Sequence, residues 1–337
     1  MAEIFEHYGL MEDWIISEIF ATNRKFFSSL ADKIGMVPDI ILIEQPWLFR
    51  FAERLNRERF RGRAKLLYGS QNVEHHLKEA ILKRYYGDRH VSESREKVLQ
   101  CELHAIARAE RTFCVSQNDV DWTSGHAARE PVLAANGVID RRASMVDIAA
   151  ANRITHGRKF ALYCASAHPP NMEGFFDIFG EGAGCIPPEA RMVVAGGAGR
   201  SLATDPRLGQ TGSLERQFID AGQVSESVLR GLLATAHVMV LPITSGGGTN
   251  LKTAEALWSG HHIVATPTAM RGFEQFANAH GICVTKESTD FLNAVREVFQ
   301  QPNLQISLRE REDRSLVLWE NTLAQMMDTI DAMEMAA

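Results

Sequence analysis

The sequence is poor in cysteine, with five in 337 residues, and no two of them form a C-x-x-C pair. An odd number of widely separated cysteines predicts neither a disulfide framework nor a zinc knuckle. Long apolar runs are absent as well, so no membrane-spanning helix is expected. Acidic Glu3 and Glu6 stand where a secretory signal would carry basic residues. These absences favour a protein of a reducing, cytoplasmic compartment.

An excess of positive charge is also missing. The chain has 36 Lys and Arg against 42 Asp and Glu, which gives a formal net charge of -6. Because non-specific nucleic-acid binding depends mainly on neutralising phosphates, we expect no nucleic-acid partner. The 45% of apolar residues is ordinary for a globular protein and excludes disordered and collagen-like classes. The length suggests two domains.

Short apolar runs alternate with helical patterns along the chain. Ile40–Ile43 is a continuous apolar run, which is typical of a strand buried on both faces of a parallel sheet. Strands that alternate with helices predict an α/β fold whose parallel sheet is covered on both sides. The expected strands are 40–43, 64–68, 112–115 and 132–134, then 160–165, 191–195, 217–220, 237–241 and 263–265.

We interpret the polar, basic stretch 151–159 as a linker between two doubly wound domains, at 1–150 and 155–312. A helix at about 315–337 is expected to pack back on the first domain. Ligands of such sheets bind at the carboxyl ends of the strands, so the two domains are expected to face each other across a cleft. The first expected element is a helix within 11–34, which predicts an N-terminal domain that lacks its first strand.

The most informative local pattern follows the strand predicted at 237–241. Three consecutive glycines, Gly246 to Gly248, separate this strand from a helix that contains Lys252 and Glu255. Glycines let the backbone approach a phosphate, and the N–H groups at a helix start attract anions. Lys252 would add a positive charge, and Glu255 would accept hydrogen bonds from ribose hydroxyls. The alternative is a plain turn with both side chains in solvent.

Other patterns have simpler interpretations. The Walker phosphate-binding motif is absent. Asp119 and Asp121 form a D-x-D pair that in other enzymes holds a metal, but acidic residues at a helix start are favoured by capping. Glu74 with His75 and His76 does not converge on one face of a helix. We interpret this triplet as a solvated surface, with Glu74 at the cleft as the alternative.

The stretch from Gly222 to Glu274 resembles the donor-binding half of glycosyltransferase family 4, whose members have the GT-B fold. The matching pieces are Gly222–Val224, Ala236–Pro242, Gly246–Lys252, Glu255–Ala256, Gly260, Ile263–Thr266 and Arg271–Glu274. Upstream pieces that resemble the family are Ser70–Glu74, Val115–Asp119, Asn136–Gly137 and Ser166–Asn171.

This resemblance implies two Rossmann-like domains, with a nucleotide diphosphate sugar in the C-terminal one and the acceptor in the N-terminal one. It implies transfer of the sugar, from UDP or GDP, to a hydroxyl of a glycan, lipid or small molecule, with retention and with no metal or other cofactor. Catalytic roles are expected for Lys252 and Gln71. Donor contacts are expected from Gly246, Gly247, Gly248, Thr249, Asn250, Lys252, Glu255, Gly197, His168 and Asn171.

The chain departs from the family at two positions that matter for activity. Gly247 stands where many members have a glutamate that contacts the sugar, and Gln71 stands where they have a histidine. Glutamine cannot titrate but can hydrogen-bond a hydroxyl. A non-catalytic binding or assembly subunit with the GT-B fold is therefore the alternative function, and peripheral association with a membrane stays open.

Overall fold

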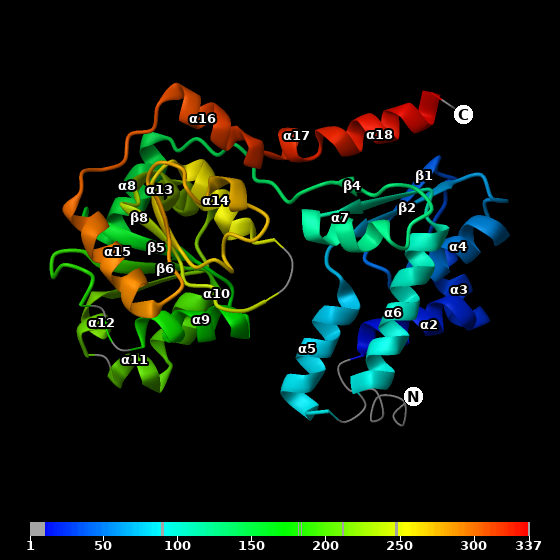
Figure 1. Cartoon of the computed structure of the whole chain (residues 1–337), viewed down its shortest axis with the longest axis horizontal. Helices are drawn as coiled ribbons and strands as arrows, with labels where there is room; N and C mark the ends of the chain where they lie inside the picture. The colour runs from blue at the N-terminus through cyan, green and yellow to red at the C-terminus, as the bar shows by residue number, and fades with distance from the viewer. Residues whose placement is uncertain are drawn as a thin grey trace. The chain divides into compact units, whose positions relative to one another are not determined.

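The computed structural model describes residues 11–88, 91–180, 182, 184–210, 212–246 and 249–335 (Figure 1). The chain forms two compact units: unit 1 is Met1–Ala135 with Leu323–Ala337, and unit 2 is Asn136–Thr322. Each unit contains one parallel sheet flanked by helices, as the sequence predicts. Among the described helices, none combines the length and the apolarity that a bilayer span requires.

Unit 1 is built on four parallel strands in the order β1-β2-β3-β4. The strands are β1 Ile40–Glu44, β2 Lys65–Ser70, β3 Arg111–Cys114 and β4 Val132–Leu133. The helices are α2 Glu12–Thr22, α3 Arg24–Ala31, α4 Phe49–Glu58, α5 Glu74–Tyr86, α6 Val91–Arg108, α7 Gln117–Ser124 and α18 Ala324–Met335.

Side chains that alternate along β2 divide the core of unit 1 between the two faces of its sheet. Leu66 and Tyr68 pack with residues of α4 and α6, whereas Leu67 packs with Met333 of α18. In Figure 1, α18 accordingly lies above this sheet and α6 below it. The Lys65 ammonium also donates to the carbonyl of Met333. Unit 1 therefore depends on the C-terminal helix to cover one face of its sheet.

The described part of the chain before β1 contains two helices. Helices α2 and α3 divide the expected 11–34 helix at Asn23, whose side chain caps α3 by accepting from the backbone of Lys25 and Phe26 (3.0 and 3.3 Å). No strand occurs within residues 11–39. Residues 1–10 lie outside the described part of the chain.

Unit 2 contains six parallel strands in the order β10-β9-β8-β5-β6-β7. The strands are β5 Phe160–Cys164, β6 Arg191–Ala195, β7 Phe218–Gly222, β8 Val238–Leu241, β9 His262–Ala265 and β10 Ile282–Val284. The α-helices are α8 Met145–Thr155, α9 Pro169–Phe179, α10 Gly197–Ala203, α11 Pro206–Gln210, α12 Gly212–Gln217, α13 Glu226–Thr235, α14 Leu251–Ser259, α15 Ser288–Gln300, α16 Leu308–Arg314 and α17 Trp319–Thr322.

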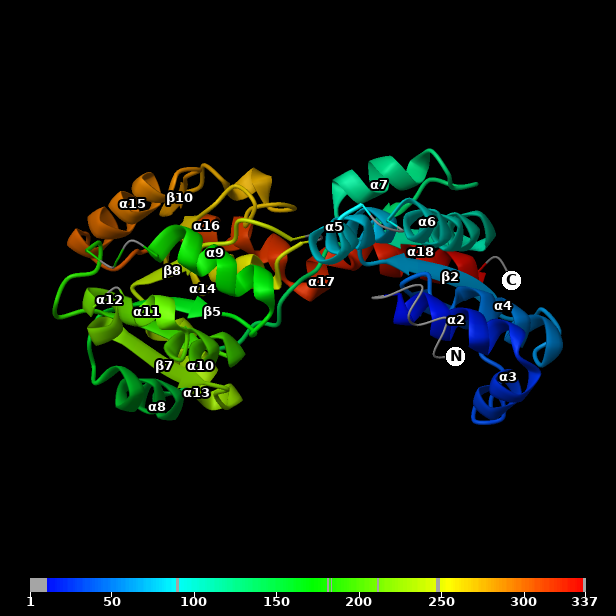
Figure 2. The same cartoon turned by 90° about the horizontal axis from the view of Figure 1, so that it is seen from below.

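Two apolar clusters fill the two sides of this sheet. One joins β5, β6 and β8 to α9, α10 and α15, and the other joins the opposite side chains of the same strands to α8, α13 and α14. Figure 2 shows α9 and α15 on one side, with α8 and α13 on the other. The chain proceeds from β5 to β6 in one direction and to β8 in the other. The topological switch point, where such sheets bind ligands, therefore lies between β5 and β8.

The division between the units comes earlier in the chain than the expected linker at 151–159. Residues 151–155 are the end of α8, which begins with a capping box formed by Ser144 and Asp147. Ala151 is fully buried, and Arg230 of α13 pairs with Asp147 at 3.1 Å. The polar, basic composition of this stretch thus comes from the exposed end of a packed helix and from the exposed turn at 156–159.

The contact between α8 and α13 generates a first prediction. A Cβ on Gly231 would overlap the carbonyl oxygen of Asp147, so Gly231→Ala must push the two helices apart. We expect a loss of about 1–3 kcal/mol in the free energy of unfolding, measured in urea. The control is Gly209→Ala in α11, where no atom lies within 4 Å of the added Cβ. Equal stability of the two variants would contradict close packing of α8 against α13.

Candidate functional site

The glycine loop runs from the end of β8 to the start of α14, at the switch point of unit 2. Gly246 has a φ of 124°, which side chains disfavour, and this explains a glycine there. Gly247 and Gly248 lie outside the described residues. Because α14 begins at Leu251, the N–H groups of Leu251 and Lys252 precede its first hydrogen-bonded turn and suit an anion near the loop, whereas that of Thr253 donates to the carbonyl of Asn250 at 2.9 Å.

Contacts from both sides hold this loop. On one side, Gly174 of α9 lies so close to the carbonyl of Pro242 that no Cβ would fit, and Thr244 donates to Asp177 at 2.7 Å. On the other side, Asn136 donates to the hydroxyl of Thr249 at 2.7 Å. The loop is therefore attached to its surroundings at both ends.

Lys252 lies in the first turn of α14 and reaches across the switch point. Its ammonium donates to the Asn171 side chain (2.7 Å), which lies in α9 after β5. Asn171 is buried, and its amide group donates to the carbonyl (2.9 Å) and the hydroxyl (3.2 Å) of Ser166. Burial lowers the pKa of Lys252. The sequence predicted that Lys252 and Asn171 belong to one site but did not predict that they touch. The structure shows that the two side chains are hydrogen-bonded.

Asn250 is the residue before α14, and its side chain makes no cap bond to the helix. Instead its amide lies 3.5 Å from the carbonyl of Thr268, so it contributes to the local structure of the loop. Its carbonyl accepts from the backbone of Thr253 at 2.9 Å.

Glu255 follows Lys252 by three residues, about one turn further along α14. Its carboxylate lies 3.6 Å from the guanidinium of Arg141, which also lies 3.5 Å from Glu226. Burial raises the pKa of Glu255, and the charge of Arg141 opposes this rise. Sequence reasoning missed Arg141, because no motif marks a basic residue that follows Asn136-Gly137 by four positions.

Arg141 belongs to a segment, residues 136–143, that contacts the site at three points. Asn136 bonds to Thr249, Asp140 accepts from the Trp258 indole at 3.1 Å, and Arg141 pairs with Glu255. The backbone of Val138 is itself paired with the chain before α17, through Val317 (2.9 Å) and Trp319 (3.1 Å). The 136–143 segment is thus attached both to the loop and to α14.

His168 and Gly197 lie at the same edge of the sheet, after β5 and β6. His168 precedes α9 and is exposed, and its side chain does not cap the helix. Gly197 begins α10, and a Cβ there would lie 3.2 Å from the Ala167 amide nitrogen. The loops after β5 and β6 are therefore in contact, with His168 and Gly197 at their junction.

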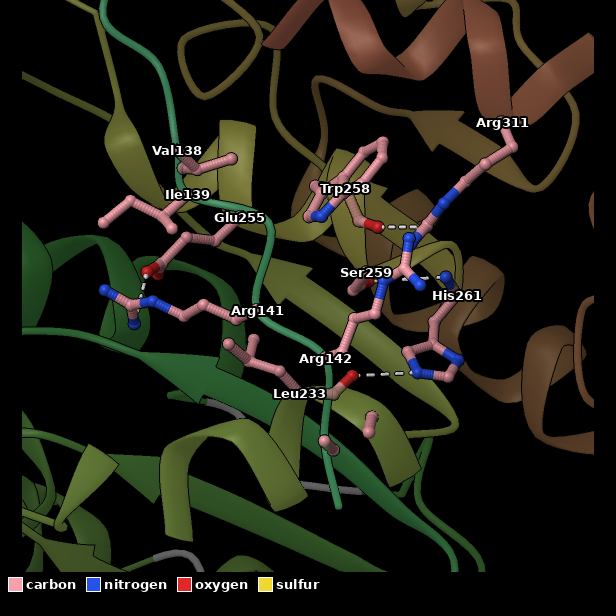
Figure 3. A pocket seen from close by; sticks show the side chains of 12 residues that line it. Val138, Ile139, Arg141, Arg142, Leu233, Glu255, Trp258, Ser259, His261 and Arg311 are labelled. Carbon is pink, nitrogen blue, oxygen red and sulfur yellow. Dashed lines mark hydrogen bonds and ion pairs between the residues drawn. The ribbon is translucent and has the colours of Figure 1, made fainter. Parts of the chain in front are cut away.

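A pocket of about 310 Å³ lies between the 136–143 segment and α14. Figure 3 shows Arg141 and Glu255 pointing toward each other on one side, with Arg142, Arg311 and His261 on the other. The ring of Trp258 lies under the Arg311 guanidinium, 3.8 Å from ring centroid to Cζ. The sequence did not predict this pocket.

In unit 1, Gln71 follows β2 at the carboxyl edge of the sheet and is half-buried. The neighbouring Glu74 and His75 are 3% and 2% exposed, so the interpretation of this triplet as a solvated surface is wrong for both residues. The reason is Glu102 of α6, a buried carboxylate that accepts from the backbone N–H groups of both and from the His75 ring at 2.6 Å.

Of the D-x-D pair, Asp119 lies in the first turn of α7, as predicted, and Asp121 lies beyond it. Ser116 precedes α7 and its hydroxyl accepts from the backbone of Asp119 at 3.2 Å, while Asp121 accepts from Gln117 at 2.8 Å. Within the described ranges, no cluster of three or more His, Cys, Asp or Glu side chains is arranged to hold a metal ion.

Comparison with known proteins identifies the domain that contains the loop. Residues 159–301 match the family of group 1 glycosyl transferases. This match lies within unit 2 and includes the glycine loop. No curated protein sequence matches the chain.

Solved structures show the fold of the whole chain. HepE of Anabaena, in complex with UDP and glucose, has a TM-score of 0.69 at 14% identity, over 93% of this chain and 83% of its own. Sucrose-phosphate synthase of Thermosynechococcus elongatus has a TM-score of 0.67 at 15% identity, over 96% and 80%. TarM of S. aureus has a TM-score of 0.63 at 12% identity, over 90% and 58%. The chain thus has the GT-B fold, and the match to group 1 glycosyl transferases lies in its second half.

Glu74 provides a prediction that tests the cluster in unit 1. Burial raises its pKa to about 7, with the charge of Glu102 adding to the rise. The folded protein then holds a proton that the unfolded chain releases near pH 4.5, so stability falls as pH rises from 4.5 to 7. We expect Glu74→Gln to be more stable than the native chain at pH 8, by on the order of 3 kcal/mol.

This stabilisation should vanish at pH 4, where both side chains are neutral. Urea unfolding at the two pH values measures it, with Glu12→Gln, an exposed position of unit 1, as the control. A stability difference for Glu74→Gln that does not change with pH would show that Glu74 is ionised in the folded protein.

Proposed function

We propose that this protein transfers a sugar from a nucleotide diphosphate sugar to an acceptor hydroxyl, with retention and without a metal ion. The observation that carries this proposal is the Lys252–Asn171 contact at the switch point of a glycosyl transferase domain. It holds an ammonium group beside the glycine loop and the start of α14. Loop, helix start and ammonium together suit a diphosphate, the leaving group of such a transfer.

Glu255 is proposed to bind the ribose of the donor. A carboxylate can accept hydrogen bonds from two neighbouring hydroxyl groups. At 3.6 Å the contact with Arg141 is longer than a charge-assisted hydrogen bond, so the carboxylate retains acceptor capacity. The charge of Arg141 opposes the rise in the Glu255 pKa that burial causes, and so favours the ionised carboxylate.

The donor base is proposed to be uracil. HepE was solved with UDP and glucose, and TarM with UDP, fondaparinux and alpha-GlcNAc-glycerol. These complexes make UDP and UDP-glucose the first compounds to test. The acceptor of this chain is proposed to bind in unit 1, where Gln71 lies at the carboxyl edge of the sheet and offers an amide to a hydroxyl.

Chemistry without a metal follows from the positive groups of the site. The Lys252 ammonium and the N-terminal dipole of α14 can stabilise the negative charge that develops on the departing diphosphate. With retention, the departing phosphate oxygen on the same face of the sugar can accept the proton of the acceptor hydroxyl. The protein then has to align the two substrates rather than supply a base.

We place the reaction in a reducing compartment, since all five cysteines are free.

Donor binding is tested by isothermal titration of the full chain with UDP. Glu255→Ala and Lys252→Ala should each weaken binding at least about tenfold, because each removes a charge-assisted contact worth roughly 1.5–3 kcal/mol. Glu297→Ala, an exposed glutamate of helix α15, is the control and should bind like the native chain. Unchanged UDP affinity in both site variants would remove the proposed donor site.

Turnover separates the enzyme from a non-catalytic GT-B subunit, which Gln71 and Gly247 leave as the alternative. We expect the native chain to release UDP from UDP-glucose, and to do so equally fast in EDTA and in Mg²⁺. The anomeric configuration of the product, read by NMR, should be that of the donor. UDP binding without any release of UDP would favour the non-catalytic subunit, and loss of turnover in EDTA would contradict the metal-free mechanism.

A further inference from the structure

The pocket beside α14 carries positive charge that the proposed donor site does not use. Its walls contain three arginines, Arg141, Arg142 and Arg311, against one carboxylate, that of Glu255. Burial lowers the pKa of His261, which therefore adds no charge near neutral pH. Arg141 is engaged by Glu255 and Glu226. The excess charge of the pocket thus comes from Arg142 and Arg311.

Arg142 and Arg311 come from distant parts of the sequence and approach each other at this pocket. Arg142 belongs to the 136–143 segment and Arg311 to α16, and Figure 3 shows both on the same side of the pocket. Burial lowers the pKa of Arg311, the charge of Asp140 opposes this effect, and the charge of Arg142 adds to it, so the two guanidinium groups repel each other. An anion between them would replace this repulsion by two attractions.

Both arginines have guanidinium N–H groups that can donate to such an anion. Arg311 stacks on the Trp258 ring and donates to the Trp258 carbonyl, which uses one of its five N–H groups. Arg142 has a side chain 90% exposed, and its contact with Asp140 is 3.3 Å long. Asp140 also accepts from the Trp258 indole, so its negative charge is shared.

The shape and the walls of the pocket indicate the size of the ligand. About 310 Å³ is at the lower end of the range for small-molecule sites. Ile139, Leu233 and Ala234 supply apolar wall, while the planar guanidinium forks of the two arginines match phosphate oxygens in pairs.

We propose that this pocket binds a small phosphate monoester, with its phosphate between Arg142 and Arg311 and its organic part against Ile139 and Leu233. The proposed phosphate position is separate from the diphosphate site, which uses Lys252 in the first turn of α14, although Glu255, the proposed ribose ligand, lines the same pocket. It does not depend on the proposed transfer reaction.

The test is isothermal titration of the full chain with glucose 6-phosphate, inorganic phosphate and unphosphorylated glucose. Arg142→Ala should weaken binding of glucose 6-phosphate by roughly tenfold or more, because one charge-assisted contact is lost. Since the Arg142 side chain is exposed, this variant should fold normally, which circular dichroism verifies. Arg158→Ala removes an equally charged, exposed residue of unit 2 outside the pocket and should leave binding unchanged.

Lys252→Ala distinguishes this pocket from the donor site, because this variant should bind UDP more weakly while its affinity for glucose 6-phosphate stays unchanged. The proposal is overturned if glucose 6-phosphate does not bind at millimolar concentration, or if Arg142→Ala binds it like the native chain. It is equally overturned if Lys252→Ala abolishes the binding or if glucose binds as tightly as its phosphate. Failure of UDP to bind would bear on the proposed function alone.

Discussion

The hydrogen bond between Lys252 and Asn171 spans the point where the strand order of unit 2 reverses, and the rest of the site depends on it. A half-buried ammonium needs a partner, and here the partner is a neutral amide. A carboxylate would have cancelled the positive charge, whereas the amide preserves it for a ligand. Gly174, which admits the carbonyl of Pro242, lets α9 and its Asn171 approach the loop closely enough for this contact.

The 136–143 segment sets the geometry of the other half of the site. Its contacts with Thr249, Trp258 and Glu255 lie on the loop and on successive turns of α14. Its backbone is fixed independently by pairing with the chain before α17. Glu255 therefore lines the 310 Å³ pocket together with two arginines of this segment. Arg141 places its positive charge beside Glu255, and Arg142 places its charge in the pocket.

Local patterns predicted the elements well, because buried parallel strands form continuous apolar runs and helices begin at capping residues. They also predicted that Lys252, Glu255 and the glycines act together, since a loop and the helix after it are adjacent in sequence. The contact between Lys252 and Asn171, and the partner Arg141 of Glu255, required the fold, because contacts between loops of different strands leave no periodicity. The same holds for Glu102, a buried acid that helical spacing alone could not distinguish from a surface residue of α6. The polar, basic stretch 151–159 suggested a linker because composition does not show that its first half is the end of a packed helix.

Buried charged groups have different surroundings in the two units. Both carboxylate oxygens of Glu102 accept from the start of α5 or from His75, so this carboxylate is engaged by the fold. Glu255 and Lys252 are both shifted by burial toward their neutral forms and have long or neutral partners. A ligand with hydroxyl groups beside Glu255 and negative oxygens beside Lys252 would satisfy both at once, since each would then contact a group that favours its charged form. Incomplete satisfaction of these two residues, rather than burial itself, is what marks α14 as the binding helix.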